Sequence, residues 1–170
     1  MLKIFNNLKP FFEDNYRRIN VREYSRIINI SPPTASKLLE KYRKQELLKK
    51  EEDKNYFYYL ANKESPLFID LSRIYHKNLL EKSGMIKYLE KELLNPIIIL
   101  FGSLSKAEAK NDSDIDLAIF TPTKKEINLE KYETILKREI QFFIFEDRKG
   151  VKNSNLLNNI LNGYKITGSW

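Results

Sequence analysis

The sequence predicts an α+β protein, with helices and a β-hairpin in its first third and buried strands alternating with helices in its C-terminal half. Three observations predict this division. Apolar residues recur at helical spacing between residues 21 and 94, a Tyr-rich run follows an acidic turn at 51–54, and an apolar run at 97–101 is too short to be a buried helix.

The composition limits the chemistry available to the chain. Its 170 residues are 42% hydrophobic, which is typical of a folded globular protein. The absence of cysteine excludes disulfides, thiolate zinc sites and a cysteine nucleophile. A single histidine excludes a histidine-based triad and multi-histidine metal sites. No apolar run approaches the ~18 residues of a membrane span, so we expect a cytoplasmic protein without a membrane partner.

The positive charge is concentrated near the N-terminus. The formal net charge is +7, and residues 1–60 account for +5 of it, whereas residues 96–170 account for only +1. Because nucleic acids are polyanions, a basic excess in one region favours a nucleic-acid partner for that region.

Three helices are expected before the hairpin, over residues 2–16, over residues 21–28, and from just after Ser31. Ser31 is a favourable N-cap, and Pro32 suits the first helical position. Apolar residues then follow at helical spacing and predict one buried stripe, while the opposite face of this third helix is short, polar and cationic. The residues of that polar face are Thr34, Ser36, Lys37, Lys41 and Lys44. A hairpin follows, with strands at about 47–50 and 55–60.

Residues 21–60 resemble the winged helix-turn-helix domain of prokaryotic regulators, in the order helix, turn, capped helix and hairpin. The resemblance implies binding to double-stranded DNA, with the third helix in the major groove. Thr34, Ser36 and Lys37 are then candidates for base edges or phosphates, and Lys41 and Lys44 for phosphates. The alternative is a small helical domain used for packing or dimerisation, with solvated lysines.

A helical connector and a region of strands complete the chain. Residues 66–94 predict one or two amphipathic helices with a break at Gly84. Strands are expected at 97–101, 114–120 and 140–145, and helices near 129–136 and 153–161. We therefore expect three regions, at 1–62, 63–95 and 96–170.

The segment with the most chemical information joins the first two of these strands. The strand at 97–101 runs into Gly102 and Ser103, where glycine allows close approach of the backbone to a ligand. The helix expected next offers free N–H groups to a phosphate. Asp114 and Asp116 are two residues apart, so on a strand their carboxylates share one face and can bind divalent cations. The alternative is a pair of surface acids on an edge strand.

Residues 99–120, ILFGSLSKAEAKNDSDIDLAIF, resemble the nucleotidyltransferase motif of the DNA polymerase beta superfamily, in particular the minimal nucleotidyltransferases and kanamycin nucleotidyltransferase. The resemblance implies a mixed β-sheet flanked by helices. It also implies transfer of a nucleoside monophosphate from an NTP, with two Mg²⁺ ions, to a hydroxyl of a protein or small molecule. Asp114 and Asp116 would hold metal, and Gly102, Ser103 and Lys106 the nucleotide.

Two positions depart from the family pattern. The family places a third carboxylate on the next strand, where this chain has Gln141; Glu139, two residues earlier, is the alternative occupant of the third catalytic position. Ala107 stands where glycine is common. The weakened acid set leaves two hypotheses for the function of the whole chain.

The first hypothesis is an active Mg²⁺-dependent nucleotidyltransferase coupled to a DNA-binding domain. The second is a DNA-binding transcriptional regulator or antitoxin-like protein, whose transferase domain senses nucleotide or binds another protein. By analogy with other winged-helix proteins, we also expect a homodimer, with the connector helices as its interface.

Overall fold

The structure, a computed structural model, describes residues 3–170 and divides the chain into two compact units. The N-terminal unit contains residues 3–72 and the segment Ala107–Asn111, and the C-terminal unit contains Arg73–Lys106 and Asp112–Trp170. Helix α4 (Pro66–Lys82) contributes residues to both units. Each unit combines helices with a β-sheet, which confirms the predicted α+β class.

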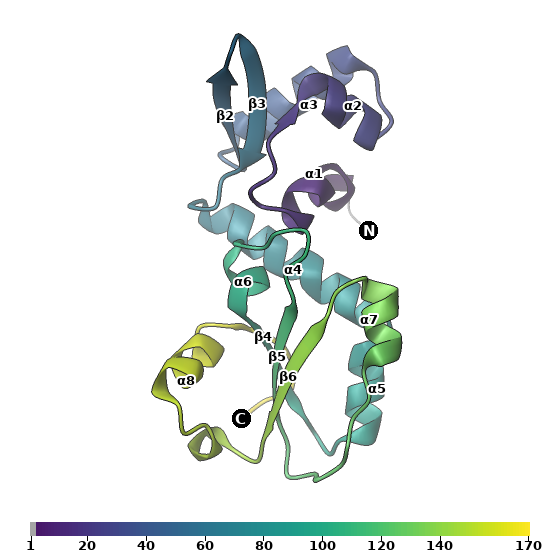
Figure 1. Cartoon of the computed structure of the whole chain (residues 1–170), viewed down its shortest axis with the longest axis vertical. Coiled ribbons are helices and arrows are strands. Elements are labelled where there is room, and N and C mark those ends of the chain that lie inside the picture. The colour runs from purple at the N-terminus through teal and green to yellow at the C-terminus, as the bar shows by residue number, and fades with distance from the viewer. Residues whose placement is uncertain (1–2) are drawn as a thin grey trace. The chain divides into compact units, whose positions relative to one another are not determined.

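The N-terminal unit places three helices beside a small antiparallel sheet (Figure 1). Its helices are α1 (Lys3–Glu13), α2 (Val21–Ile27) and α3 (Pro32–Lys44), and its strands are β1 (Ile19–Asn20), β2 (Leu48–Asp53) and β3 (Tyr56–Ala61), in the order β1-β3-β2. Ser31 caps α3 as expected, because its side chain accepts a hydrogen bond from the Thr34 backbone N–H. The buried stripe of α3 is also confirmed, with Ala35, Leu39 and Tyr42 buried.

Helix α1 ends at Glu13, so its predicted extension to residue 16 is wrong, and Leu2 lies outside the described residues. The cause is Asn15, which is fully buried and pairs with Ala109 instead of continuing the helix. Its backbone N–H donates to the Ala109 carbonyl at 2.8 Å, and its side-chain oxygen accepts from the Ala109 N–H at 2.7 Å. A partner so distant in the chain leaves no trace in local periodicity.

A carboxylate fastens α3 to the hairpin. Glu40 accepts hydrogen bonds from the Tyr59 hydroxyl at 2.5 Å, from Arg43 at 2.8 Å and from Lys50 at 2.9 Å. These donors favour the ionised form, and they lower the pKa of Glu40 to about 2, with the Tyr59 hydrogen bond as the largest cause. The ion pairs therefore hold two cations against Glu40, on the side of α3 that faces the hairpin.

Glu40→Gln is expected to destabilise the N-terminal unit at neutral pH and not in acid. A lowered pKa means that the stabilisation is present above the ordinary glutamate pKa and is lost as the pH falls towards 2. Because the carboxylate remains partly exposed, we expect only about 1 kcal/mol at pH 7. Hydrogen exchange of the α3 amides in the wild type and the variant, at neutral and at acid pH, measures the loss of stability at each pH. Glu46→Gln, at an exposed carboxylate, is the control, and an equal effect of both variants contradicts this assignment.

The C-terminal unit is a mixed four-stranded sheet with helices on both sides (Figure 1). The strand order is β6-β5-β4-β7; β4 runs antiparallel to both neighbours, and β5 pairs with β6 in parallel. Its remaining elements, in chain order, are α5 (Met85–Glu92), β4 (Ile97–Phe101), α6 (Gly102–Lys106), β5 (Ile115–Phe120), α7 (Glu130–Leu136), β6 (Ile140–Phe145), a 3-10 turn at Arg148–Gly150, α8 (Ser154–Leu161) and β7 (Tyr164–Thr167).

The two faces of this sheet are covered by different helices. Helix α8 packs on the face that carries Phe120 and Ala118, whereas α5 and α7 lie on the other side and contact each other through Tyr88 and Tyr132, whose ring centroids are 5.5 Å apart. The predicted break at Gly84 is confirmed, since Gly84 has a φ of 83° between α4 and α5.

Three strand predictions differ from the structure. The hairpin turn predicted at 51–54 lies at 54–55, because β2 continues to Asp53 and Glu51, Glu52 and Asp53 pair with β3. Strand β5 begins at Ile115, because Ile115 and Ile140 form the first pair of the parallel ladder, so Asp114 precedes the strand. Strand β7 was not expected; its few residues pair with β4 and close that edge of the sheet. Within residues 3–170, no helix has the length and apolar character needed to cross a bilayer.

Candidate active site

Gly102 and Asp116 meet at one end of the C-terminal sheet. Phe101, the last residue of β4, is the ladder partner of Asp116 on β5, so the turn after β4 lies beside the carboxylate. Gly102 has a φ of 67°, and a Cβ built on it would lie 2.0 Å from Asp116 Oδ2. The carboxylate thus occupies the space that any other side chain at position 102 would fill.

Asp114 and Asp116 are two neighbouring carboxylates whose negative charges repel each other. Both side chains are half-buried. Burial raises the pKa of Asp116, and the charge of Asp114 raises it further. A bound cation would relieve both effects.

Gln141 lies in the third position of this site. It is the ladder partner of Asp116 in the parallel β5–β6 pair, and its Nε2 donates to Asp114 Oδ2 at 2.9 Å. Glu139 comes before β6, its side chain is exposed, and its backbone carbonyl accepts from the Ile115 N–H at 2.8 Å. An amide therefore stands beside the acids. Among residues 3–170, no group of three or more acidic or histidine side chains is placed to hold a metal ion.

Basic residues outside the predicted site residues support the turn and the segment before Asp114. The Arg73 guanidinium donates to the Ser105 carbonyl at 2.7 Å, and the Ser105 hydroxyl donates back to the Gly102 carbonyl at 2.9 Å. Arg138 donates to the Ser113 carbonyl, next to Asp114. These partners lie far apart in the chain, so no local pattern indicates them.

The predicted nucleotide-binding residues sit at the start and end of α6. Ser103, in the first turn, is half-buried. Lys106, at the other end, donates from Nζ to Asn159 Oδ1 of α8 at 3.0 Å. The ammonium of Lys106 is thus engaged by the protein itself, so the structure brings Gly102, Asp114 and Asp116 together but ties Lys106 to a neighbouring helix.

The segment between α6 and the acids belongs to the N-terminal unit. Ala107 has a φ of 54°, in the left-handed region that favours glycine, which explains the glycine common at this position in the family it resembles. Ala109 is buried and pairs with Asn15 through both of its backbone groups. The segment Ala107–Asn111 is therefore held by side-chain and backbone contacts within that unit.

Residues 84–164 match the family model described as Polymerase beta, Nucleotidyltransferase. The match includes the glycine turn, both acids and Gln141, and it supports a nucleotidyltransferase domain at these residues, with nucleotidyl transfer as its general chemistry. It begins at Gly84, between α4 and α5, and does not reach the N-terminal unit's helices. Comparison with curated proteins and with solved structures gives no significant match.

The predicted DNA-binding residues lie along α3. Thr34, Lys37, Lys41 and Lys44 are exposed, and Ser36 is half-buried. Successive residues in the set Thr34, Lys37, Lys41 and Lys44 are three or four positions apart. Their side chains therefore lie along one side of the helix. No ion pair is formed by these three lysines within the described residues, in contrast to the cations held by Glu40.

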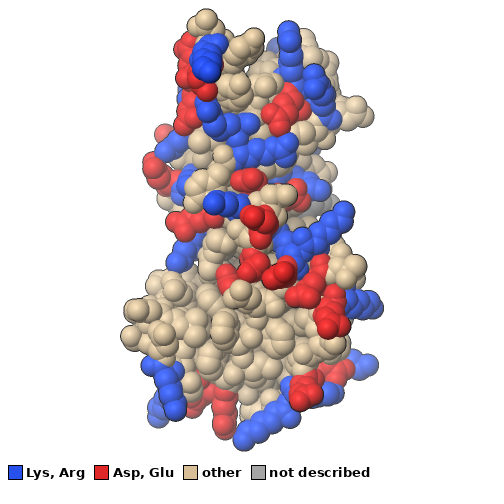
Figure 2. All heavy atoms as spheres, viewed as in Figure 1, with Lys and Arg blue, Asp and Glu red and all other residues tan. Residues whose placement is uncertain are grey.

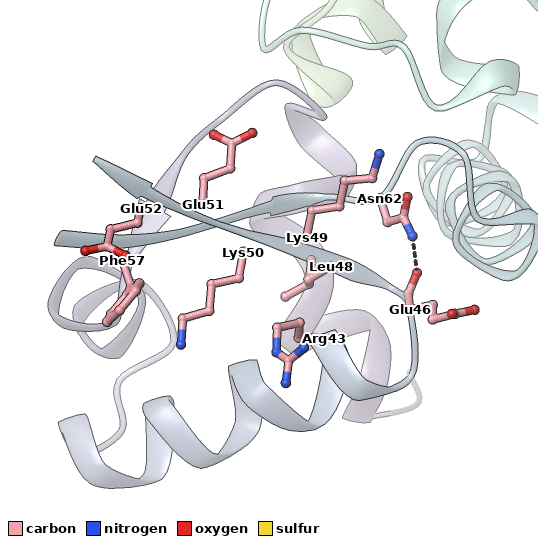
Figure 3. A pocket seen from close by; sticks show the side chains of 9 residues that line it. All are labelled: Arg43, Glu46, Leu48, Lys49, Lys50, Glu51, Glu52, Phe57 and Asn62. Carbon is pink, nitrogen blue, oxygen red and sulfur yellow. Dashed lines mark hydrogen bonds between the residues drawn. The ribbon is translucent and has the colours of Figure 1, made fainter. Parts of the chain in front are cut away.

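A groove between α3 and the hairpin carries mixed charge (Figure 3). It has a volume of about 660 Å³, and its walls contain cations from both elements together with three glutamates. Lys50 lies over the Phe57 ring, 4.1 Å from its centroid. Figure 2 likewise shows basic and acidic side chains intermingled on the N-terminal unit. Within the described residues, the α3 lysines that form no ion pair are therefore better suited to bind a polyanion than this groove of mixed charge.

Proposed function

We propose that the C-terminal unit is a Mg²⁺-dependent nucleotidyltransferase that moves a nucleoside monophosphate from an NTP to a hydroxyl acceptor. The observation that carries this proposal is the seating of the Asp116 carboxylate against Gly102, with Asp114 beside it. In the reaction, the acceptor oxygen bonds to the α-phosphorus, the bond to the β-phosphate breaks, and pyrophosphate leaves.

Asp114 and Asp116 fit the ligand chemistry of magnesium. Mg²⁺ is commonly held by one or two carboxylates together with substrate phosphates and water, and this pair supplies two carboxylates. When bound, the ion neutralises charge on the triphosphate and lowers the pKa of the attacking hydroxyl. The pair is better matched to one ion than to the two expected from the family, since Gln141 adds an amide and no charge.

Gly102 and Ser103 are the proposed contacts of the triphosphate. The missing side chain at Gly102 lets the Asp116 carboxylate lie against the turn, next to the proposed phosphate position, and Ser103 adds a hydroxyl. Helix α6 has only five residues, so its dipole contributes little, and the phosphates depend chiefly on the metal. The hydrogen bond to Asn159 uses one of the three N–H donors of the Lys106 ammonium, so Lys106 can still donate to a phosphate.

We further propose that the N-terminal unit is a winged helix-turn-helix domain that binds double-stranded DNA. The support is the exposed, unpaired stripe of Lys37, Lys41 and Lys44 on a helix whose opposite face is buried. In the hairpin, Glu51, Glu52 and Asp53 offset the charges of Lys49, Lys50 and Lys54, so α3 would carry most of the affinity for phosphates.

Transfer is tested with two differently labelled nucleotides. We expect Mg²⁺-dependent labelling of a component of a cell extract, or of the protein itself, from α-labelled ATP or GTP and not from γ-labelled ATP or GTP, because pyrophosphate carries the γ-phosphate away. Chelation of the metal should abolish the signal. Equal labelling from the γ-position would indicate phosphoryl transfer and contradict the proposal.

A second candidate function, nucleotide sensing by a DNA-binding regulator, is favoured by two observations. Gln141 stands where a charged ligand is expected, which weakens catalysis more than binding. Asn15 of the N-terminal unit pairs with Ala109, in the segment that joins the glycine turn to the acids. Nucleotide-dependent DNA affinity without transfer from α-labelled NTP would support this function over the first.

A further inference from the structure

An exposed aromatic side chain lies on the same sheet face as the acids. Phe143 on β6 is two residues beyond Gln141, and its ladder partner is Ala118, two residues beyond Asp116. Residues two apart on a strand point to the same face, so Phe143, Gln141 and Asp116 share one face. Phe143 is 37% exposed and lies on β6, an edge strand of the sheet.

Neighbouring rings hold Phe143 in place. The Phe101 ring lies 6.1 Å away, in a diagonal position on the far side of β5, and the Phe145 ring lies 6.5 Å away at an interplanar angle of 8°. Phe145 packs against the buried cluster of this sheet face, as Leu156 and Leu157 of α8 do, whereas Phe143 is not among the residues of that cluster. Its ring is therefore fixed by packing on one side and open on another.

The surface in the region of β6 and α8 is uncharged. Figure 2 shows an extended area without charged side chains in the region of β6 and α8. The step from Gln141 to Phe143 covers roughly 7 Å along the strand. A ribose bridges such a gap between an α-phosphate at the acids and a base at the ring. A planar, uncharged ligand group attached to a phosphate suits this position.

We propose that Phe143 is the surface on which the nucleobase of the NTP stacks. This inference rests on the proposed nucleotidyltransferase function, and it names how that site takes the base. Stacking on a phenyl ring is tolerant of base identity because every base has a π-face. ATP, GTP, CTP and UTP should therefore bind with affinities within about tenfold of one another, purines best, since the larger ring system covers more of the phenyl surface.

The experiment compares a nucleotide with its phosphate chain alone. Calorimetric titration of the full chain with Mg²⁺ and non-hydrolysable ATP should give weaker binding in Phe143→Ala by about 5- to 100-fold. Binding of inorganic triphosphate with Mg²⁺ should be unchanged. Phe143→Leu, which keeps the apolar volume without the ring, should weaken ATP binding similarly, and Phe143→Tyr should preserve it.

Ile144→Ala is the matched control. Ile144 is adjacent on β6, is 36% exposed, and points to the opposite face, so its removal should leave both ligands unaffected. Equal ATP affinity in wild type and Phe143→Ala overturns the stacking assignment. An equal loss of ATP and triphosphate binding in Phe143→Ala also overturns it, because the effect is then on the phosphate site. If the wild type binds neither ligand, the proposed function fails together with this inference.

Discussion

Gly102→Ala is expected to abolish Mg²⁺-dependent nucleotidyl transfer, with a loss of at least about a hundredfold. The added Cβ would lie 2.0 Å from Asp116 Oδ2 and 2.8 Å from its Cγ, so the carboxylate must move. Asp116 sits in a β-ladder between Phe101 and Gln141, which prevents the backbone from following. Asp116 is one of the two proposed metal ligands. Its displacement would take a negative charge away from the metal position and distort the arrangement of ligands at the triphosphate site.

Gly84→Ala separates this effect from backbone strain. Gly84 has a φ of 83° and lies in the same unit, but a Cβ built there meets no atom within 4 Å. Both variants thus carry a similar penalty of about 1 kcal/mol for a left-handed alanine, and only Gly102→Ala displaces a carboxylate. Label transfer from α-labelled NTP and thermal unfolding are measured on both. Full transfer by Gly102→Ala would show that Asp116 does not act from its present position.

Lys37→Ala with Lys41→Ala should weaken binding to duplex DNA by about 10- to 100-fold at low salt. Both lysines are exposed on one side of α3 and have no ion-pair partner within the described part of the chain. If each contacts one phosphate, the slope of log affinity against log salt falls by about 2. Fluorescence anisotropy with labelled duplexes at several salt concentrations gives both quantities.

Lys87→Ala with Lys91→Ala provides the charge-matched control. These lysines are exposed on α5 in the C-terminal unit, so the pair changes the net charge equally without touching α3. An unchanged affinity in the α3 variant, or equal losses in both variants, would mean that α3 is not the DNA-reading helix and that the N-terminal unit serves another role.

Local features of the fold were predictable from the sequence because their causes are local. The cap at Ser31 and the break at Gly84 each depend on one residue type in a fixed geometry. The strand at Ile97–Phe101 is a continuous apolar run because both faces of β4 are buried. The motif predicted that the two acids lie near the glycine turn. The structure adds the close contact between Gly102 and the Asp116 carboxylate.

Other features depend on contacts between distant residues and were not predictable. Helix α1 stops short because Asn15 pairs with Ala109, ninety-four positions away. Strand β7 is a short polar and apolar mixture that becomes a strand only beside β4. From the sequence, Phe143 is expected to be an ordinary core residue. The parallel register of β5 and β6 shows instead that its exposed ring lies on the same sheet face as the acids.

A metal-dependent triphosphate site at Gly102, Asp114 and Asp116 can be tested by calorimetric titration with a non-hydrolysable NTP analogue. The wild type should bind the analogue in the presence of Mg²⁺ and much more weakly without it, and the Asp114→Asn, Asp116→Asn double variant should lose the metal-dependent part. Binding of the same strength in the double variant, or no binding by the wild type at any Mg²⁺ concentration, would contradict the account.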